Sequence, residues 1–172
     1  MEKLFIVLFA ICMSTSGYSQ KCAIKKGYAY ERSSLSGTPP RKVLDESGNQ
    51  IERPVKNNNT YFIYIESKRG RIFQPTRMWI AGKPFTVATE TITHLPVIIQ
   101  YEHPAMPADT LVRQTSNTVI RLLPQAELID KPDARLAKKI AQANVVIEFT
   151  RNSRTFYYTI KDTKKLTPLV LQ

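Results

Sequence analysis

The stretch VVIEFTRNSRTFYYTI, residues 145–160, decides the fold class of this chain. Apolar and polar side chains alternate along both of its halves, and this period of two is typical of strands with one face in a core. Asn152-Ser153 separates the halves and supplies turn chemistry. The stretch therefore predicts a β-hairpin. The side chains expected to face the core are Val145, Ile147 and Phe149 on one strand and Phe156, Tyr158 and Ile160 on the other.

Strand signals continue upstream of this hairpin. Residues 61–65 are apolar at every position and rich in aromatic and β-branched side chains, which predicts a central strand covered on both faces. Turn signals at 46–49 predict a small hairpin over 42–53. Further strands are expected at 27–31, 78–81, 85–90, 97–102, 110–114, 119–123 and 169–171, and the core is expected to include Ile63, Val87, Ile99, Ile147, Phe149 and Tyr158.

One helix is expected, over 132–144. Leu136 and Ile140 lie on one face of it, Asp130 and Asp133 suit its amino end, and lysines fall toward its carboxyl end. Many short strands with turns between them and a single helix indicate a mainly β fold. We expect a single antiparallel β-sandwich or partly open barrel, with one short helix near the C-terminus.

The amino terminus reads as a secretory signal peptide. Leu4–Met13 is an unbroken apolar run, and a small, polar stretch follows it over 14–19. Small residues at Gly17 and Ser19 place the cleavage site before Gln20. The run is too short to remain as a membrane anchor, which needs about 20 residues. A lipoprotein anchored through Cys22 is the other alternative, but Gln20 and Lys21 precede that cysteine instead of small apolar residues.

The expected export places the protein in the periplasm, in the cell envelope or outside the cell. Residues 20–172 form one domain by length, with a flexible lead-in over 20–27 and no membrane span after cleavage. Cys22 is then the single cysteine, so no internal disulfide forms, and we expect it to be an idle tail residue rather than a reactive or bridged thiol.

Charge restricts the choice of partner. The net charge is +11, so the protein is attracted to anionic surfaces. Export argues against nucleic acid as the partner. Another protein, or an anionic component of the envelope or extracellular space, is the expected partner, although the basic residues are scattered and also serve solubility.

No recognisable catalytic motif is present. No serine lies in a Gly-x-Ser-x-Gly elbow, and no glycine-rich loop leads from a strand into a helix. His94 and His103 flank one predicted strand and are therefore expected at its opposite ends, too far apart to share a metal ion. The sequence assigns no catalytic residue, no metal site and no cofactor.

The one concentration of charge beside an aromatic residue lies between 68 and 83. Cationic side chains around an exposed indole would suit an acidic or sugar ligand. The alternative is a solvated hairpin tip beside a core tryptophan. The candidate ligand- or partner-binding residues are Lys68, Arg69, Arg71, Arg77, Trp79 and Lys83.

Three functional hypotheses follow from these observations. The leading one is an exported, non-enzymatic, β-rich interaction domain that binds an envelope or extracellular component. The second is a binder of an anionic small molecule or glycan through the basic region at 68–83. The third is an envelope hydrolase whose site is assembled from distant residues and is invisible in the sequence.

We predict that the exported protein begins at Gln20, because small residues at Gly17 and Ser19 are what signal peptidase requires. Intact-mass measurement of exported material checks this. A mass that retains Leu4–Met13 would contradict it, and a diacylglycerol adduct on Cys22 would support the lipoprotein alternative.

Overall fold

The computed structural model describes residues 24–36, 42–44, 50–52, 58–69, 74–101, 106–151 and 154–171. The expected signal peptide, its cleavage site, Cys22, Arg71 and His103 lie outside these residues. The elements are β1 (Ile24–Ser36), β2 (Lys42–Leu44), β3 (Gln50–Glu52), β4 (Asn58–Ser67), β5 (Pro75–Ile80), β6 (Lys83–Ile92), β7 (Val97–Ile99), β8 (Asp109–Val112), β9 (Thr118–Glu127), α2 (Ala134–Ala141), β10 (Val145–Arg151), β11 (Arg154–Ile160), β12 (Lys164–Lys165) and β13 (Leu169–Leu171).

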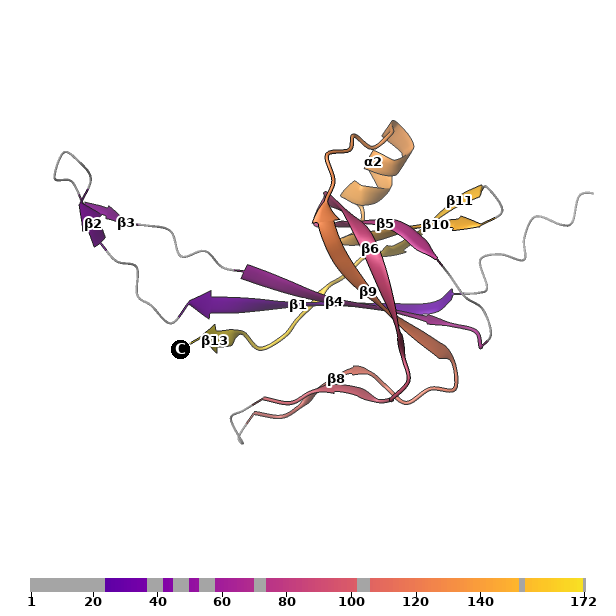
Figure 1. Cartoon of the computed structure of the whole chain (residues 1–172), viewed down its shortest axis with the longest axis horizontal. Helices are drawn as coiled ribbons and strands as arrows, with labels where there is room; N and C mark the ends of the chain where they lie inside the picture. Colours follow the sequence, from indigo (N-terminus) through magenta and orange to yellow (C-terminus); the bar gives the residue numbers. More distant parts are fainter. Residues whose placement is uncertain are drawn as a thin grey trace, which may run out of the picture.

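The predicted mainly β fold, in its partly open barrel form, is confirmed. The main sheet has the strand order β11-β10-β5-β6-β9-β4-β1-β12, with β13 also paired to β1, and it curls into a half-barrel (Figure 1). Two further sheets each contain two strands, β2 with β3 and β7 with β8. The hairpins predicted at 42–53 and 145–160 are both present as antiparallel pairs.

One part of the topology departs from the antiparallel expectation. β12 and β13 run parallel to β1, at Tyr30 and Glu31 and at 34–36 respectively. After β11 the chain crosses to the free edge of β1 and follows that strand in the same direction. Local alternation of side chains carries no information about strand direction, so the sequence did not predict this pairing.

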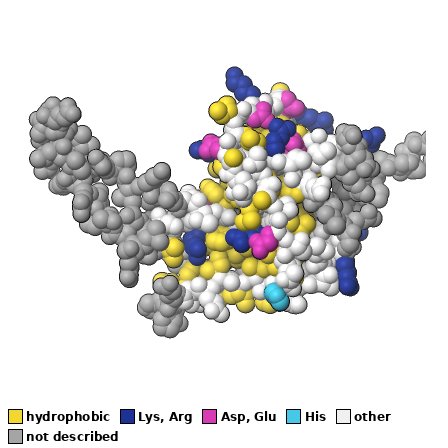
Figure 2. Space-filling view, viewed as in Figure 1, with side chains coloured by type: hydrophobic (Ala, Val, Ile, Leu, Met, Phe, Trp, Pro, Cys, Tyr) yellow, Lys and Arg dark blue, Asp and Glu magenta, His cyan; other side chains and the backbone are white. Residues whose placement is uncertain are grey.

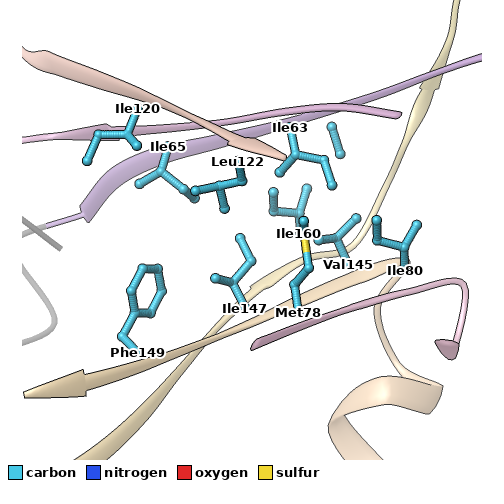
Figure 3. Close-up of a cluster of buried hydrophobic side chains, with 11 residues drawn as sticks. Ile63, Ile65, Met78, Ile80, Ile120, Leu122, Val145, Ile147, Phe149 and Ile160 are labelled. Atoms are coloured by element: carbon cyan, nitrogen blue, oxygen red, sulfur yellow. The ribbon is translucent and has the colours of Figure 1, made fainter. Parts of the chain in front are cut away.

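The interior of the half-barrel is an aliphatic core. Figure 3 shows side chains from β4 and β9 pointing toward those from β5, β10 and β11. Ile63, Ile147 and Phe149 are buried there as predicted. Val87 and Tyr158 are half-buried and pack against the core from its margin. Ile99 is also half-buried, and it belongs to a second cluster on the other face of the sheet.

The two edges of the curled sheet meet at a glycine. A Cβ atom on Gly27 of β1 would lie 2.6 Å from Tyr158 Cε1 and 2.9 Å from Ile160 Cδ1. The two β11 side chains therefore pack directly on the β1 backbone, an approach that only glycine permits. This contact helps to explain why β1 already begins at Ile24, within the expected flexible lead-in over 20–27. Ile24 pairs with Ser67 and packs against the core.

The prediction that 61–65 is a central strand is confirmed in β4. Ile63 and Ile65 enter the aliphatic core, whereas Phe62 and Tyr64 point to the opposite, outer face. There Tyr64 joins Tyr30, Leu111, Val112, Val119 and Leu166 in a cluster that β7 and β8 cover. The Tyr30 hydroxyl donates a hydrogen bond to the Leu111 carbonyl beneath this cover.

The helix is shorter than the predicted 132–144. The Asp133 carboxylate accepts a hydrogen bond from the Leu136 N–H at 2.7 Å, so the helix begins at Ala134. It ends at Ala141, with Lys138 and Lys139 in its last turn as expected. Leu136 is buried against Trp79 and Val146, so α2 covers the outer face of β5 and β10.

We predict that Phe149→Ala destabilises the protein by roughly 3–5 kcal/mol, because the ring is enclosed and its loss leaves a cavity. The denaturant midpoint measures the change. Thr150→Ala is the control: its side chain is exposed on the same strand, and we expect a shift below about 0.5 kcal/mol. Equal shifts for the two variants would show that the assigned register of β10 is wrong.

Candidate functional site

Of the basic residues singled out between 68 and 83, the described Lys68 and Arg69 lie far from Lys83. Lys68 and Arg69 directly follow β4, whose last residue, Ser67, pairs with Thr118 at the start of β9. Lys83 begins β6, which reaches Glu127 at the other end of β9. A strand rises about 3.3 Å per residue, so roughly 30 Å of β9 separates the two groups. Arg71 lies outside the described residues.

Trp79 is not an exposed platform. Its side chain is 1% exposed and lies beneath α2, which is the core-tryptophan alternative raised by the sequence. Arg77 lies beside it, with Cζ 5.7 Å from the indole ring, and forms ion pairs with Glu148 and Asp130. Lys83 reaches Glu127 at 3.6 Å, and both of these side chains are well exposed, so the pair is weak.

Glu148 is a buried carboxylate held by donors from neighbouring strands. Arg77 donates from Nε at 2.9 Å and from Nη2 at 3.2 Å, and Thr76 donates at 2.8 Å. Burial opposes ionisation, but these donors and Tyr157 outweigh it, so the pKa of Glu148 lies below its ordinary value. Arg77 also donates a hydrogen bond to Asp130, which precedes α2. Arg77 therefore anchors the segment before α2 to the sheet.

Glu66 has a similar role at the other end of the sheet. Tyr28 and Thr115 each donate a hydrogen bond at 2.8 Å to its carboxylate, and Asn117 donates a third. Burial would raise the pKa of Glu66, but the three donors lower it below its ordinary value. Burial and the contact with Glu66 raise the pKa of Tyr28. The carboxylate thus fixes the segment between β8 and β9 to β1 and β4.

A different cluster gathers cationic and aromatic side chains on the outer face. Arg32 of β1 has its Cζ 5.3 Å from the ring centroid of Phe62 of β4, and Arg121 of β9 has its Cζ 5.9 Å from the same centroid. We call these three residues the Arg–Phe–Arg surface. Each distance is within the roughly 6 Å range of a cation–π interaction.

The register of three strands builds this surface. Arg32 pairs with Thr60 and Arg121 pairs with Tyr64, so the two arginines flank Phe62 from diagonally opposite positions. Diagonal neighbours on one face of a sheet lie within reach of long side chains. The arrangement therefore runs obliquely across β1, β4 and β9.

The arginines of this surface retain free donor capacity. Arg121 Nη1 lies 3.5 Å from Glu90 Oε2, which is the limit of a hydrogen bond. Arg32 forms no ion pair with any residue that the structure describes. A guanidinium carries five N–H donors in a planar fork that matches a carboxylate or phosphate. The surface can therefore accept an anionic group.

Apolar side chains border the Arg–Phe–Arg surface. Phe62 belongs to the half-buried margin of the outer cluster, together with Tyr28, Ile92, Leu95, Val97 and Ile99. Figure 2 shows the hydrophobic side chains as a band in the region of β1, β4 and β8, with basic and acidic side chains set into it. The surface thus combines cationic donors with accessible apolar area.

The sequence contained only part of the signal for this surface. Arg121 stands in the middle of a predicted strand, and a charge at such a position indicates an outward or functional side chain. Its proximity to Arg32 and Phe62 depends on pairing among three strands distant in sequence. That register was not available from the chain alone.

The comparisons with known proteins add no resemblance: no family model, curated protein or solved structure matches the chain. Within the described ranges, no helix is long and apolar enough to cross a membrane. The same residues contain no group of three or more His, Cys, Asp or Glu side chains placed to hold a metal ion.

We predict that Glu66 makes stability depend on acidity. Its folded pKa is lowered, so its contribution is present above the unfolded value and is lost as pH falls through the folded value. Unfolding midpoints measured between neutral and acidic pH should fall below about pH 5. Glu66→Gln should lower stability at neutral pH by about 1–2 kcal/mol and flatten this decline. The control Glu127→Gln removes an exposed carboxylate and should change neither the stability at neutral pH nor its decline in acid. If the stability of Glu66→Gln declined in acid as steeply as that of the wild type, the prediction would be contradicted.

Proposed function

We propose that this protein is an exported, non-enzymatic binding domain, and that its ligand is an anionic component of the cell envelope or extracellular space. The apolar run at 4–13 and the small residues before Gln20 support export. The net charge of +11 supports an anionic ligand. The observation that carries the proposal is the Arg–Phe–Arg surface.

This surface is suited to binding because its cations are already positioned. An exposed arginine loses side-chain entropy when it is fixed against a ligand. Stacking on Phe62 restricts Arg32 and Arg121 before any ligand arrives, so less of this cost remains. Their guanidinium edges stay available for charge-assisted hydrogen bonds, which are about twice as strong as neutral ones.

Four of the described carboxylates are engaged in contacts within the fold, which supports binding over hydrolysis. Glu66 and Glu148 are occupied by donors that connect strands, and Asp133 caps α2. Asp109 accepts hydrogen bonds from Tyr101 and Lys164. General acid–base or nucleophilic work needs a carboxylate within reach of a substrate. No observation favours a hydrolase, and the separation of Lys68 from Lys83 leaves the second hypothesis without a common surface.

The test compares two variants with the same change of charge. Arg32→Gln/Arg121→Gln removes both cations of the surface, and Arg135→Gln/Lys138→Gln removes two exposed cations of α2. Binding to envelope and extracellular fractions of the producing cells is measured at low and moderate salt. We expect the first variant to bind about tenfold or more weakly, because each lost charge-assisted hydrogen bond is worth about 1.5–3 kcal/mol.

The α2 variant should bind within about threefold of the wild type, because exposed charges away from the contact mainly affect encounter. Thermal unfolding of both variants checks that folding is intact. Equal losses in the two variants would reduce the interaction to general charge attraction and contradict the proposal.

A further inference from the structure

We infer that the Arg–Phe–Arg surface binds an acidic polypeptide segment in which an apolar side chain lies between two carboxylates, and that Glu90 competes with this segment for Arg121. The inference rests on the proposed function and names the class of its partner. It depends on three features of the surface: the spacing of the cations, the apolar margin and the weakness of the Glu90 ion pair.

The spacing of the two cations fits an extended peptide. Both Cζ atoms lie within 6 Å of the Phe62 centroid, so no more than about 11 Å separates them. In an extended segment, side chains on one face recur every ~7 Å along the chain. A segment with an acidic residue at position i, an apolar residue at i+2 and an acidic residue at i+4 therefore spans ~13 Å on one face. This spacing places each carboxylate beyond one guanidinium and the apolar side chain over Phe62.

The apolar margin favours a polypeptide over other anions. Half-buried Leu95, Val97 and Ile99 belong, with Phe62, to the apolar margin of the outer cluster. Removing such area from water is worth about 25 cal/mol per Å², but only when the ligand also presents apolar atoms. Phosphate and acidic polysaccharide lack apolar side chains, whereas a protein segment supplies carboxylates and apolar side chains together.

Glu90 is placed to compete with the ligand. Its Oε2 atom is 3.5 Å from Arg121 Nη1, longer than the optimum of about 2.9 Å, and its side chain is 54% exposed. Exposed pairs of this kind contribute about 0–1 kcal/mol, so an incoming carboxylate can displace Glu90 at little cost. Removal of the Glu90 charge should therefore strengthen binding.

The experiment uses a labelled dodecapeptide in which glutamate and leucine alternate at every second position with serine between them, so that both share one face of the extended chain. Its affinity is measured by fluorescence anisotropy for the wild type and for Glu90→Gln, Arg121→Gln and Glu127→Gln. Glu127 is the matched control, because its ion pair with Lys83 at 3.6 Å is equally long and exposed but lies at the other end of β9. Both glutamate variants raise the net charge by the same amount, so general attraction would affect them equally.

We expect Glu90→Gln to tighten binding about three- to tenfold, Glu127→Gln to change it less than twofold, and Arg121→Gln to weaken it about tenfold or more. A peptide of the same composition with its glutamates grouped at one end should bind more weakly than the alternating one. Equal effects of Glu90→Gln and Glu127→Gln, or equal binding of the two peptides, would overturn the inference.

Two further probes separate this inference from the proposed function. Polygalacturonate and inorganic phosphate are measured with the same variants. Binding of either probe that needs Arg32 and Arg121, without binding of the peptide, would overturn the polypeptide inference and leave the proposed function standing. Failure of Arg32→Gln/Arg121→Gln to weaken binding of any probe or of the cell fractions would overturn both.

Discussion

The half-barrel depends on the contact of Tyr158 and Ile160 with Gly27. A curled sheet that does not close has two edges, and here side-chain packing on a backbone brings them together. Burial of the two side chains holds β11 against β1. Because the edges meet, the aliphatic core is enclosed. The outer face of the curved sheet is covered by two smaller layers, α2 and the β7–β8 pair.

Buried carboxylates consolidate this architecture at both ends of the sheet. Glu148 binds Arg77 under α2, and Glu66 binds donors from β1 and from the segment between β8 and β9. A buried charge is tolerated only when donors replace its lost hydration. These two carboxylates therefore stabilise the fold, and the excess cationic side chains lie at the surface. The protein's charge of +11 is thus a property available to a partner.

The Arg–Phe–Arg surface is formed by the pairing of β4 with β1 and β9 on the outer face of the curved sheet. Phe62 alternates with the core residues of β4 and so must face outward, and pairing of β4 with β1 and β9 sets Arg32 and Arg121 on either side of it. Cations stacked on an aromatic ring beside an apolar margin form a surface that recognises charge and apolar shape together. Glu90 adds a built-in competitor for one of the cations.

The sequence by itself determined the local elements. Period-two alternation predicted the hairpin over 145–160, an unbroken apolar run predicted the central position of β4, and Asp133 was expected at the amino end of the helix. These features depend on residues a few positions apart, so composition and spacing are enough to predict them. The mainly β class and the burial of Ile63, Ile147 and Phe149 follow from the same local patterns.

Only the tertiary structure decided which residues share a surface. Lys68 and Lys83 are near in sequence but stand at opposite ends of β9, whereas Arg32 and Arg121 are far apart in sequence and flank one ring. Burial of Trp79 beneath α2 decided between the exposed-indole and core-tryptophan alternatives that the sequence left open. Strand order and register are set by the packing of the whole sheet, because alternation specifies which face a side chain occupies but not which strand lies beside it.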